Sequence, residues 1–548
     1  MSSFAIQRQE KPWLLSALAI ATLIGLPIIS VVYLAVFPEE NAWTHLANTV
    51  LPYYLKNTLM LMVGVVTLTF LVGTGAAWLI SMYNFPGKRL LSWALLLPFA
   101  VPAYVVAYVY TDLLEYAGPI QSTLRDIFGW QSAQDYWFPE IRSMGGAIIM
   151  MSLALYPYVY MLARTSFLDQ SISLYQVSRS LGVTPFVFFY RVSLPIARPA
   201  IAVGLALVLM ETLNDFGTVD YFAVQTLTAG LYDTWLNMGN LGGAAQIAGV
   251  MVIVVVLLVS LERYSRRQQK QFNSRNHGNP IPCQTLTGIK AVLATTAALL
   301  PVVLGFFIPF IVLSSYAFHY FDVSWSSDFL TFASNSFGLS AIAAILTLIL
   351  GTLLAYSKRM NKHPLTNIAI RVSSLGYAIP GAVLAIGIII PFAWFDNQLD
   401  AFMRSTFGIS TGLVLSGTAF AVLFAYLVRF LAVASGSIES SLDKVTPNMD
   451  MASRSLGHSY MGTLTRIHLP IIRRGALTAM LVVFVDCMKE LPATLILRPF
   501  NFETLATQVY QFASDELLEQ SALSALVIVL VGIIPVILLD KTISKQDT

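Results

Sequence analysis

The chain has 548 residues, of which 56% are apolar and only 11% are charged, and its formal net charge is +3. An ordinary soluble domain carries about 25% charged residues, so this composition excludes a water-soluble globular protein. We expect an integral protein of the lipid bilayer, and we expect no nucleic acid among its partners.

Long apolar segments recur along the whole chain. A helix needs about 20 predominantly apolar residues to cross the hydrocarbon core. The first segment, 13–36, is too long for the apolar part of a secretory signal and lacks a cleavage site of small residues, so we expect it to be retained. The roughly twelve predicted spans are 13–36, 57–82, 91–111, 144–163, 199–217, 243–261, 291–317, 336–356, 372–394, 411–434, 475–497 and 521–539.

Basic residues mark one side of the predicted membrane. Lysines and arginines in short loops stay on the cytoplasmic side, and here they fill alternate loops from Arg8 and Lys11 onward. The opposite loops are acidic or mixed, as at Asp135 and Asp400. An even number of spans agrees with this pattern, so we predict that both termini are cytoplasmic.

A polar stretch divides the chain into two halves. It is basic and rich in amides, and Gly278, Pro280 and Pro282 interrupt it, which is typical of a linker. We predict a first six-helix repeat over 1–262, a basic cytoplasmic linker over 263–288 and a second six-helix repeat over 289–548.

One polar motif occurs in both halves. The pentapeptide Ser-Arg-Ser-Leu-Gly stands at 178–182 and 453–457, and nine residues later each copy reaches a hydrophobic–x–Leu–Pro ending. The two copies are separated by 457 − 182 = 275 residues, and the prolines by 470 − 195 = 275. A fixed period of this length indicates two copies of one domain. A local interpretation is that Gly182 and Gly457 end helices in the left-handed conformation, but this does not explain the repeated polar residues.

The motif resembles the EAA loop of ABC-importer membrane subunits, Glu-Ala-Ala-x3-Gly-x9-Ile-x-Leu-Pro. Both copies match the glycine, the gap and the Leu-Pro, and both depart at the acidic position, which holds Gln176 and Met451. The resemblance implies the all-α type I ABC importer permease fold, in which a short helix before the glycine docks on the ATPase. With both copies in one chain, it implies a homodimeric ATPase on the cytoplasmic side. The implied coupling residues are Gln176, Ser178, Arg179, Ser180, Leu181 and Gly182, with Met451, Ser453, Arg454, Ser455, Leu456 and Gly457.

The segments 210–218 and 486–494, just after the two loops, resemble permeases of the ferric-iron importer family. This resemblance implies a multi-pass subunit of the bacterial inner membrane that receives ferric iron from a periplasmic iron-binding protein. The chain has no Gly-x4-Gly-Lys-Ser/Thr phosphate loop. We therefore expect no cofactor on this chain and no enzyme activity of its own, with ATP and magnesium on the partner ATPase. Another solute, such as thiamine or a phosphonate, remains an alternative, as does a secondary transporter with two six-helix halves.

Acidic residues also recur at the offset of 275 inside the predicted spans. Each pair is spaced i, i+4 and would share one helix face. A charge at the centre of a span costs about 2.5–3.5 kcal/mol, and a polar pathway is a reason to place it there. Alternatively, Asp486 and Lys489 form a structural ion pair. The predicted pathway residues are Glu211, Asn214, Asp215, Asp486, Lys489 and Glu490, and the four acids are candidates for transient metal contacts because hard cations prefer oxygen ligands.

Overall fold

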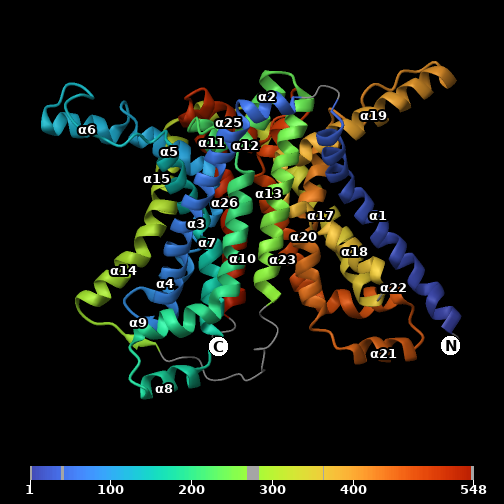
Figure 1. The fold of residues 1–548 in the computed structure, drawn as a ribbon, viewed down its shortest axis with the longest axis horizontal. Helices are drawn as coiled ribbons and strands as arrows, with labels where there is room; N and C mark the ends of the chain where they lie inside the picture. Colours follow the sequence, from blue (N-terminus) through green and yellow to red (C-terminus); the bar gives the residue numbers. More distant parts are fainter. Residues whose placement is uncertain (1–2, 39–41, 268–282, 362, 545–548) are drawn as a thin grey trace. The chain divides into compact units, whose positions relative to one another are not determined.

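The computed structural model describes residues 3–38, 42–267, 283–361 and 363–544 (Figure 1). Most of these residues are helical, as the long apolar segments predict. The helices of the first half are α1 (Ser3–Val36), α2 (Trp43–Asn48), α3 (Leu51–Met82), α4 (Lys88–Ala94), α5 (Ala103–Leu114), α6 (Pro119–Phe128), α7 (Met144–Leu168), α8 (Ile172–Ser180), α9 (Pro185–Phe188), α10 (Leu194–Asn214), α11 (Gly217–Tyr221), α12 (Leu227–Tyr232) and α13 (Leu241–Arg267). Those of the second half are α14 (Ile289–Val302), α15 (Ile308–His319), α16 (Phe321–Ser324), α17 (Ser327–Met360), α18 (Pro364–Ser373), α19 (Gly381–Phe407), α20 (Ala419–Leu442), α21 (Pro447–Ser455), α22 (Tyr460–Thr463), α23 (Leu469–Met488), α24 (Pro492–Leu497), α25 (Leu505–Ser514) and α26 (Leu518–Ser544).

Shorter elements connect these helices. Of the linker predicted at 263–288, residues 268–282 lie outside the described residues, and the part that follows forms a two-residue strand. This strand, β2 (Gln284–Thr285), pairs in parallel with β1 (Tyr83–Asn84). The remaining elements are π-helical turns at Phe189–Ser193, Asp233–Asn237, Val303–Phe307 and Leu464–His468, and 3-10 turns at Leu97–Ala100 and Gly376–Ala378.

Ten helices of the described residues are long and apolar enough to cross a membrane. An eleventh span results if the segments Lys88–Ala100 and Ala103–Phe128, bent by 91°, are counted as one. The predicted span 475–497 covers most of α23, which has Arg473 and Arg474 near its start and ends at Met488, and also the short helix α24. The count of twelve spans and the cytoplasmic placement of both termini therefore stay predictions.

The described chain divides into two compact units, and each unit takes helices from both halves of the sequence. The first unit comprises 1–46, 231–252 and 327–507, and the second comprises 47–230, 253–326 and 508–548. In the first unit, α1 packs against α17, α18 and α19, as Figure 1 shows for α18. In the second unit, α14 packs against α3 and α4, and α15 packs against α5 and α26. The first helix of each half thus completes the unit built mainly from the other half.

The two units repeat the same hydrogen bonds at an offset of 278. In each unit, two consecutive residues near the start of a long helix, an asparagine and a hydroxyl residue, form hydrogen bonds with a distant segment. That segment leads into a short helix. The bonds in the second unit are Asn57 Nδ2 to Gln225 O at 2.9 Å and Leu227 N to Thr58 Oγ1 at 2.9 Å. Those in the first unit are Asn335 Nδ2 to Glu503 O at 3.0 Å and Leu505 N to Ser336 Oγ at 2.7 Å. The internal repeat therefore extends to individual side chains.

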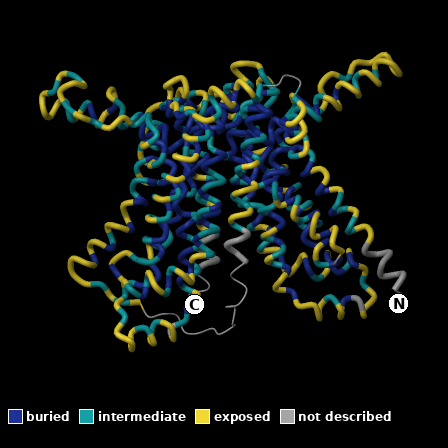
Figure 2. Tube along the Cα trace, viewed as in Figure 1, coloured by how far each residue is buried: buried dark blue, intermediate teal, exposed yellow. Residues whose placement is uncertain are grey.

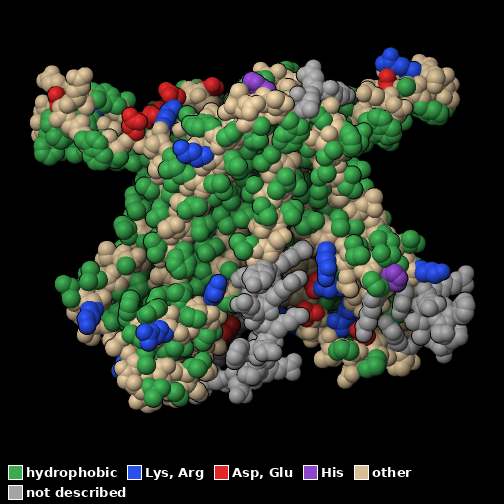
Figure 3. All heavy atoms as spheres, viewed as in Figure 1, with side chains coloured by type: hydrophobic (Ala, Val, Ile, Leu, Met, Phe, Trp, Pro, Cys, Tyr) green, Lys and Arg blue, Asp and Glu red, His purple; other side chains and the backbone are tan. Residues whose placement is uncertain are grey.

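The surface of each unit is consistent with a lipid environment. Figure 2 shows buried residues concentrated where the long helices pack, with α6 and the C-terminal end of α19 exposed. Hydrophobic side chains cover the outside of the long helices, and lysines and arginines gather near the helix ends (Figure 3). Apolar surface of this extent is typical of helices that face lipid tails rather than water.

Gly387→Ala is expected to destabilise the contact between α1 and α19. A Cβ at this position would lie 2.2 Å from the carbonyl O of Pro27, so one helix must move. Such overpacking costs about 1–3 kcal/mol, and we expect a lower midpoint of thermal unfolding for the purified protein. Gly436→Ala in α20 is the matched control, because nothing lies within 4 Å of its added Cβ. Equal midpoints for the two variants would contradict this packing.

Candidate functional site

Each copy of the repeated pentapeptide ends a short helix, α8 or α21. The glycines that follow, Gly182 and Gly457, have φ of 76° and 82°. In both copies the amide N after the glycine donates to the carbonyl O of the first serine, at 3.0 Å in the first and 3.1 Å in the second. This bond satisfies a carbonyl at the helix end, and glycine adopts the left-handed conformation without strain. The local interpretation of these glycines is confirmed.

The nine-residue gap forms a corner that leads from the short helix into α10 or α23. In the first copy, Thr184 Oγ1 accepts a hydrogen bond from Val187 N at 3.4 Å, and in the second, Ser459 Oγ accepts one from Gly462 N at 3.1 Å. A π-helical turn then precedes the Leu-Pro in both copies. Proline has no N–H to donate, so the regular helical hydrogen bonds are interrupted at this point. The spacing of the motif is therefore a requirement of backbone geometry.

Apolar side chains of both loops are exposed at equivalent positions. Leu181 and Leu456 are 76% and 77% exposed. The exposed pairs at the offset of 275 are Leu174 with Met449, Leu181 with Leu456, and Phe186 with Met461. We call each set of three a loop surface. The same pattern of large exposed apolar side chains therefore occurs in both copies.

The predicted coupling residues fall around these loop surfaces. Those that are exposed are Gln176, Arg179, Ser180, Met451 and Ser455. Ser178 is half-buried, whereas Ser453 is buried and its Oγ lies 2.7 Å from Thr463 Oγ1. The side chain of Arg454 lies outside the described residues. The two copies are thus anchored differently despite their identical sequence.

An ion pair anchors the second loop. Asp450 Oδ2 accepts a hydrogen bond from Arg359 Nε at 2.9 Å, and Asp450 Oδ1 lies 2.7 Å from His468 Nε2. Arg359 also donates to the carbonyl O of Leu442 at 2.6 Å and of Val445 at 2.8 Å. Burial lowers the pKa of His468, and the contact with Asp450 opposes that shift. The start of α21 is therefore tied by charge to the end of α17.

Aromatic packing takes the place of this ion pair in the first loop. The counterpart of Asp450 is Tyr175, since 450 − 175 = 275. Its ring packs edge-on against Phe188 at 5.3 Å, and its hydroxyl accepts a hydrogen bond from Gln284. The departure from the family motif at Gln176 and Met451 does not produce the difference in anchoring, because both side chains are exposed. The difference in anchoring comes from the preceding residue in each loop, which is Tyr175 in the first and Asp450 in the second.

The predicted acids lie where two helices break. α10 and α23 end at Asn214 and Met488, so Asp215 and Glu490 stand beyond the helices. The prediction that each acid pair shares a continuous helix face is wrong for this reason. Asp215 Oδ1 accepts a hydrogen bond from Thr218 N at 2.9 Å, and Glu490 Oε1 accepts one from Ala493 N at 3.2 Å. Both carboxylates satisfy freed amides at the start of the next short helix, where negative charge is favourable.

Glu490 also has a buried counterion. Arg429 Nη1 lies 2.9 Å from Glu490 Oε1, and their side chains are only 5% and 4% exposed. A Cβ on Gly381 would lie 2.7 Å from that same oxygen, so the glycine leaves room for the pair. The residue equivalent to Arg429 in the first half is Ala154, since 429 − 154 = 275. Arg429 is not among the residues predicted from the sequence, although a single arginine inside the predicted span 411–434 is a signal that it has a partner.

The remaining predicted pathway residues are more accessible. Lys489 Nζ lies 3.1 Å from Asp486 Oδ1, which is the ion pair that their spacing allows. Both of these side chains, and those of Glu211 and Asp215, are half-buried, whereas Asn214 is buried. In the described part of the chain, no group of three or more His, Cys, Asp or Glu side chains is arranged to hold a metal ion. Capping and ion pairing account for the contacts of Asp215 and Glu490, and metal contact stays a prediction.

Breaking the buried pair is expected to destabilise the protein. Arg429→Met or Glu490→Gln alone leaves one buried charge without its counterion, which costs about 3–5 kcal/mol. We expect low membrane abundance for each single variant and partial recovery in the double variant. Asp486→Asn is the comparison variant, because it breaks an ion pair whose side chains are half-buried rather than buried, and a smaller loss of abundance is expected. Normal abundance of both Arg429→Met and Glu490→Gln would contradict a structural role.

Comparison with known proteins places these features in a family. Residues 69–270 and 347–546 both match the family described as binding-protein-dependent transport system inner membrane component. Over 543 residues the chain is 28% identical to the Fe(3+)-transport system permease protein FbpB 2 of Haemophilus influenzae, covering 97% of this chain and 99% of that protein. It is 24% identical over 434 residues to the ferric transport system permease protein FbpB of Actinobacillus pleuropneumoniae, covering 73% of this chain and 58% of the relative.

A shorter match covers about a third of the chain. The molybdenum transport system permease protein ModB of Escherichia coli K12 is 29% identical over 177 residues, which is 31% of this chain and 74% of that protein. The predicted internal repeat and the predicted importer-permease resemblance are thereby confirmed. The chain belongs to the family of inner membrane components of binding-protein-dependent transport systems, and it carries the family's domain twice.

Proposed function

We propose that the chain is the permease of an ATP-binding-cassette importer that carries ferric iron across the bacterial inner membrane. In this proposal a periplasmic binding protein delivers the iron, and a separate homodimeric ATPase, which holds ATP and magnesium, drives transport. The proposal that the substrate is ferric iron rests on the alignment with a relative named for Fe(3+) transport. This alignment spans 97% of this chain. Both termini are cytoplasmic in this proposal, as the basic loops indicate.

Related importers with other substrates are the main competitors. The relatives named for molybdenum and sulfate transport match only 26–38% of this chain. Importers of thiamine or a phosphonate would share the loop motif. Thiamine and phosphonate are therefore tested as substrates together with molybdate and sulfate. A secondary transporter would not need two matched loop surfaces, and its transport would not require ATP hydrolysis.

The half-buried acids are our candidates for the lining of the pathway. Glu211, Asp215 and Asp486 keep part of their surface accessible, whereas Glu490 is buried against Arg429. Carboxylate oxygens suit a hard cation such as ferric iron. We therefore assign the passage of the ion to the accessible acids and a structural role to Glu490.

Reconstituted transport tests the substrate and this assignment together. With the ATPase and the binding protein present, we expect ATP-dependent uptake of radiolabelled ferric iron into proteoliposomes, and no comparable uptake of molybdate, sulfate, thiamine or phosphonate. Glu211→Gln is expected to lower iron uptake without lowering abundance, because removing a half-buried charge eases insertion. Preferred uptake of another solute would refute the iron assignment, and ATP-independent uptake would refute the importer class.

Substitutions on the loop surfaces test ATPase docking. Leu181→Glu and Leu456→Glu place a charge at a well-exposed apolar position, so the fold should be unaffected. If each leucine is a central contact, we expect ATPase co-purification to fall by about tenfold or more. Leu413→Glu is the matched control, because Leu413 is 62% exposed but lies in the loop between α19 and α20. Full co-purification with both loop variants would exclude these surfaces as the docking sites.

A further inference from the structure

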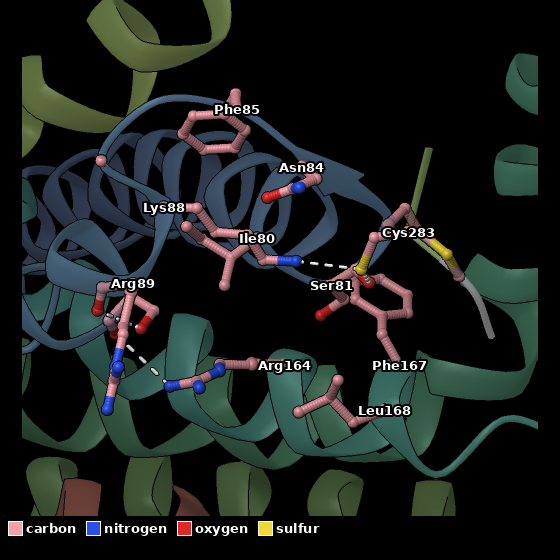
Figure 4. A pocket seen from close by; sticks show the side chains of 13 residues that line it. Ile80, Ser81, Asn84, Phe85, Lys88, Arg89, Arg164, Phe167, Leu168 and Cys283 are labelled. Carbon is pink, nitrogen blue, oxygen red and sulfur yellow. Dashed lines mark hydrogen bonds between the residues drawn. The ribbon is translucent and has the colours of Figure 1, made fainter. Parts of the chain in front are cut away.

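A cavity of about 570 Å³ lies in the second unit, where α3 ends and α4 begins (Figure 4). Side chains from α3, α4 and α7 line it, and Cys283 closes one side. Its volume lies within the range of about 300–1,000 Å³ that is usual for small-ligand sites. Neither the coupling loops nor the predicted pathway acids contribute to this cavity.

The lining is positively charged. Three of the thirteen lining residues are cations, Lys88, Arg89 and Arg164, and none of the thirteen is an aspartate or a glutamate. Arg164 is 5% exposed, and its Nη1 donates to the carbonyl O of Ser92 at 3.4 Å. Lys88 Nζ donates to Cys283 Sγ at 2.9 Å. The cavity therefore brings together three positive charges, one of them buried, and its described lining residues include no carboxylate.

The other half of the chain distributes its charges differently. The counterparts of the three cations are Thr366 for Lys88 and Asn367 for Arg89, at the offset of 278, and Glu439 for Arg164, at the offset of 275. Glu439 forms an ion pair with Lys358, so a negative and a positive charge balance there. At the offset of 278, Lys358, Arg359 and Lys362 stand where the first half has the lining residues Ile80, Ser81 and Asn84. Arg359 is paired with Asp450, as Lys358 is with Glu439. The first half differs in bringing its three cations together beside described lining residues that include no carboxylate.

We propose that this cavity binds a phosphate-bearing ligand. Guanidinium and ammonium groups are the side chains that bind phosphate, the former through paired hydrogen bonds and the latter as a point charge. Phe85, Phe167 and Leu168 supply an apolar wall beside the cations, which suits an organic body attached to the phosphate. The phosphate belongs either to the headgroup of an anionic phospholipid or to a soluble phosphate compound. This inference does not depend on iron as the transported substrate.

Cys283 is a natural reporter of occupancy. It is exposed and lies at the cavity, whereas the other cysteine of the chain, Cys487, is 2% exposed. A ligand that engages Lys88 therefore shields the one accessible thiol. The rate at which a maleimide reacts with the purified full-length protein measures this shielding directly.

The experiment has two arms, both in nanodiscs. In the first arm, the discs contain either phosphatidylcholine alone or added phosphatidylglycerol. In the second arm, the discs contain phosphatidylcholine alone, and inorganic phosphate is compared with chloride at equal ionic strength. When nine in ten cavities are occupied, the reaction of Cys283 is expected to slow by about tenfold. Slowing in the first arm identifies a lipid headgroup, and slowing in the second identifies a soluble phosphate.

Variants separate binding at this cavity from general charge effects. Arg89→Gln and Arg164→Gln are expected to abolish most of the protection, measured as the ratio of rates with and without the ligand. Arg198→Gln removes an exposed cation outside the cavity and should leave this ratio unchanged. Arg89 is exposed, so its variant is expected to fold even if Arg164→Gln does not. The absence of protection in both arms, or equal protection in Arg89→Gln and Arg198→Gln, would overturn the proposal.

Discussion

Every backbone amide and every charge inside an apolar layer must find a partner within the protein, because lipid offers none. The breaks after α10 and α23 are where this constraint is most severe, since each break frees amides at the start of the next short helix. Asp215 and Glu490 meet the requirement by accepting hydrogen bonds from those amides. In the second half Arg429 compensates the charge of Glu490, and Gly381 leaves the space that the pair occupies. The interrupted helices are possible because their ends are satisfied by these side chains.

Neither compact unit is assembled from one half of the sequence alone. α1 packs with helices of the second half, and α14 packs with α3 and α4 of the first. The close approach of Gly387 to the carbonyl of Pro27 shows how tightly α1 fits in its unit. Either half alone would lack the helix that the other half supplies to its unit, which is α1 or α14. This exchange makes the folding of each unit depend on both repeats.

The two repeats have diverged where their surroundings differ. Three features are equivalent in the two repeats. They are the hydrogen bonds made by Asn57 and Asn335, those accepted by Thr184 and Ser459, and the exposed apolar positions of the loops. The anchors of the loops are not, because Asp450 pairs with Arg359 while Tyr175 packs on an aromatic ring. The cationic cavity is built mainly on first-half residues, and Glu439 stands where that half has Arg164. A shared framework thus carries two different sets of polar contacts.

The sequence by itself determined the membrane class, the repeat and the loop motif. These features depend on local composition and on spacing along the chain, which the fixed offset of 275 makes visible without a structure. The left-handed glycines after α8 and α21 were also predictable, because a helix end is a local event. Only the tertiary structure decided which acids are capped, paired or accessible, since Arg429 and Glu490 are 61 residues apart in sequence. It also decided the exchange of α1 and the convergence of Lys88, Arg164 and Cys283 on one cavity, because long-range packing, not spacing along the chain, brings these residues together.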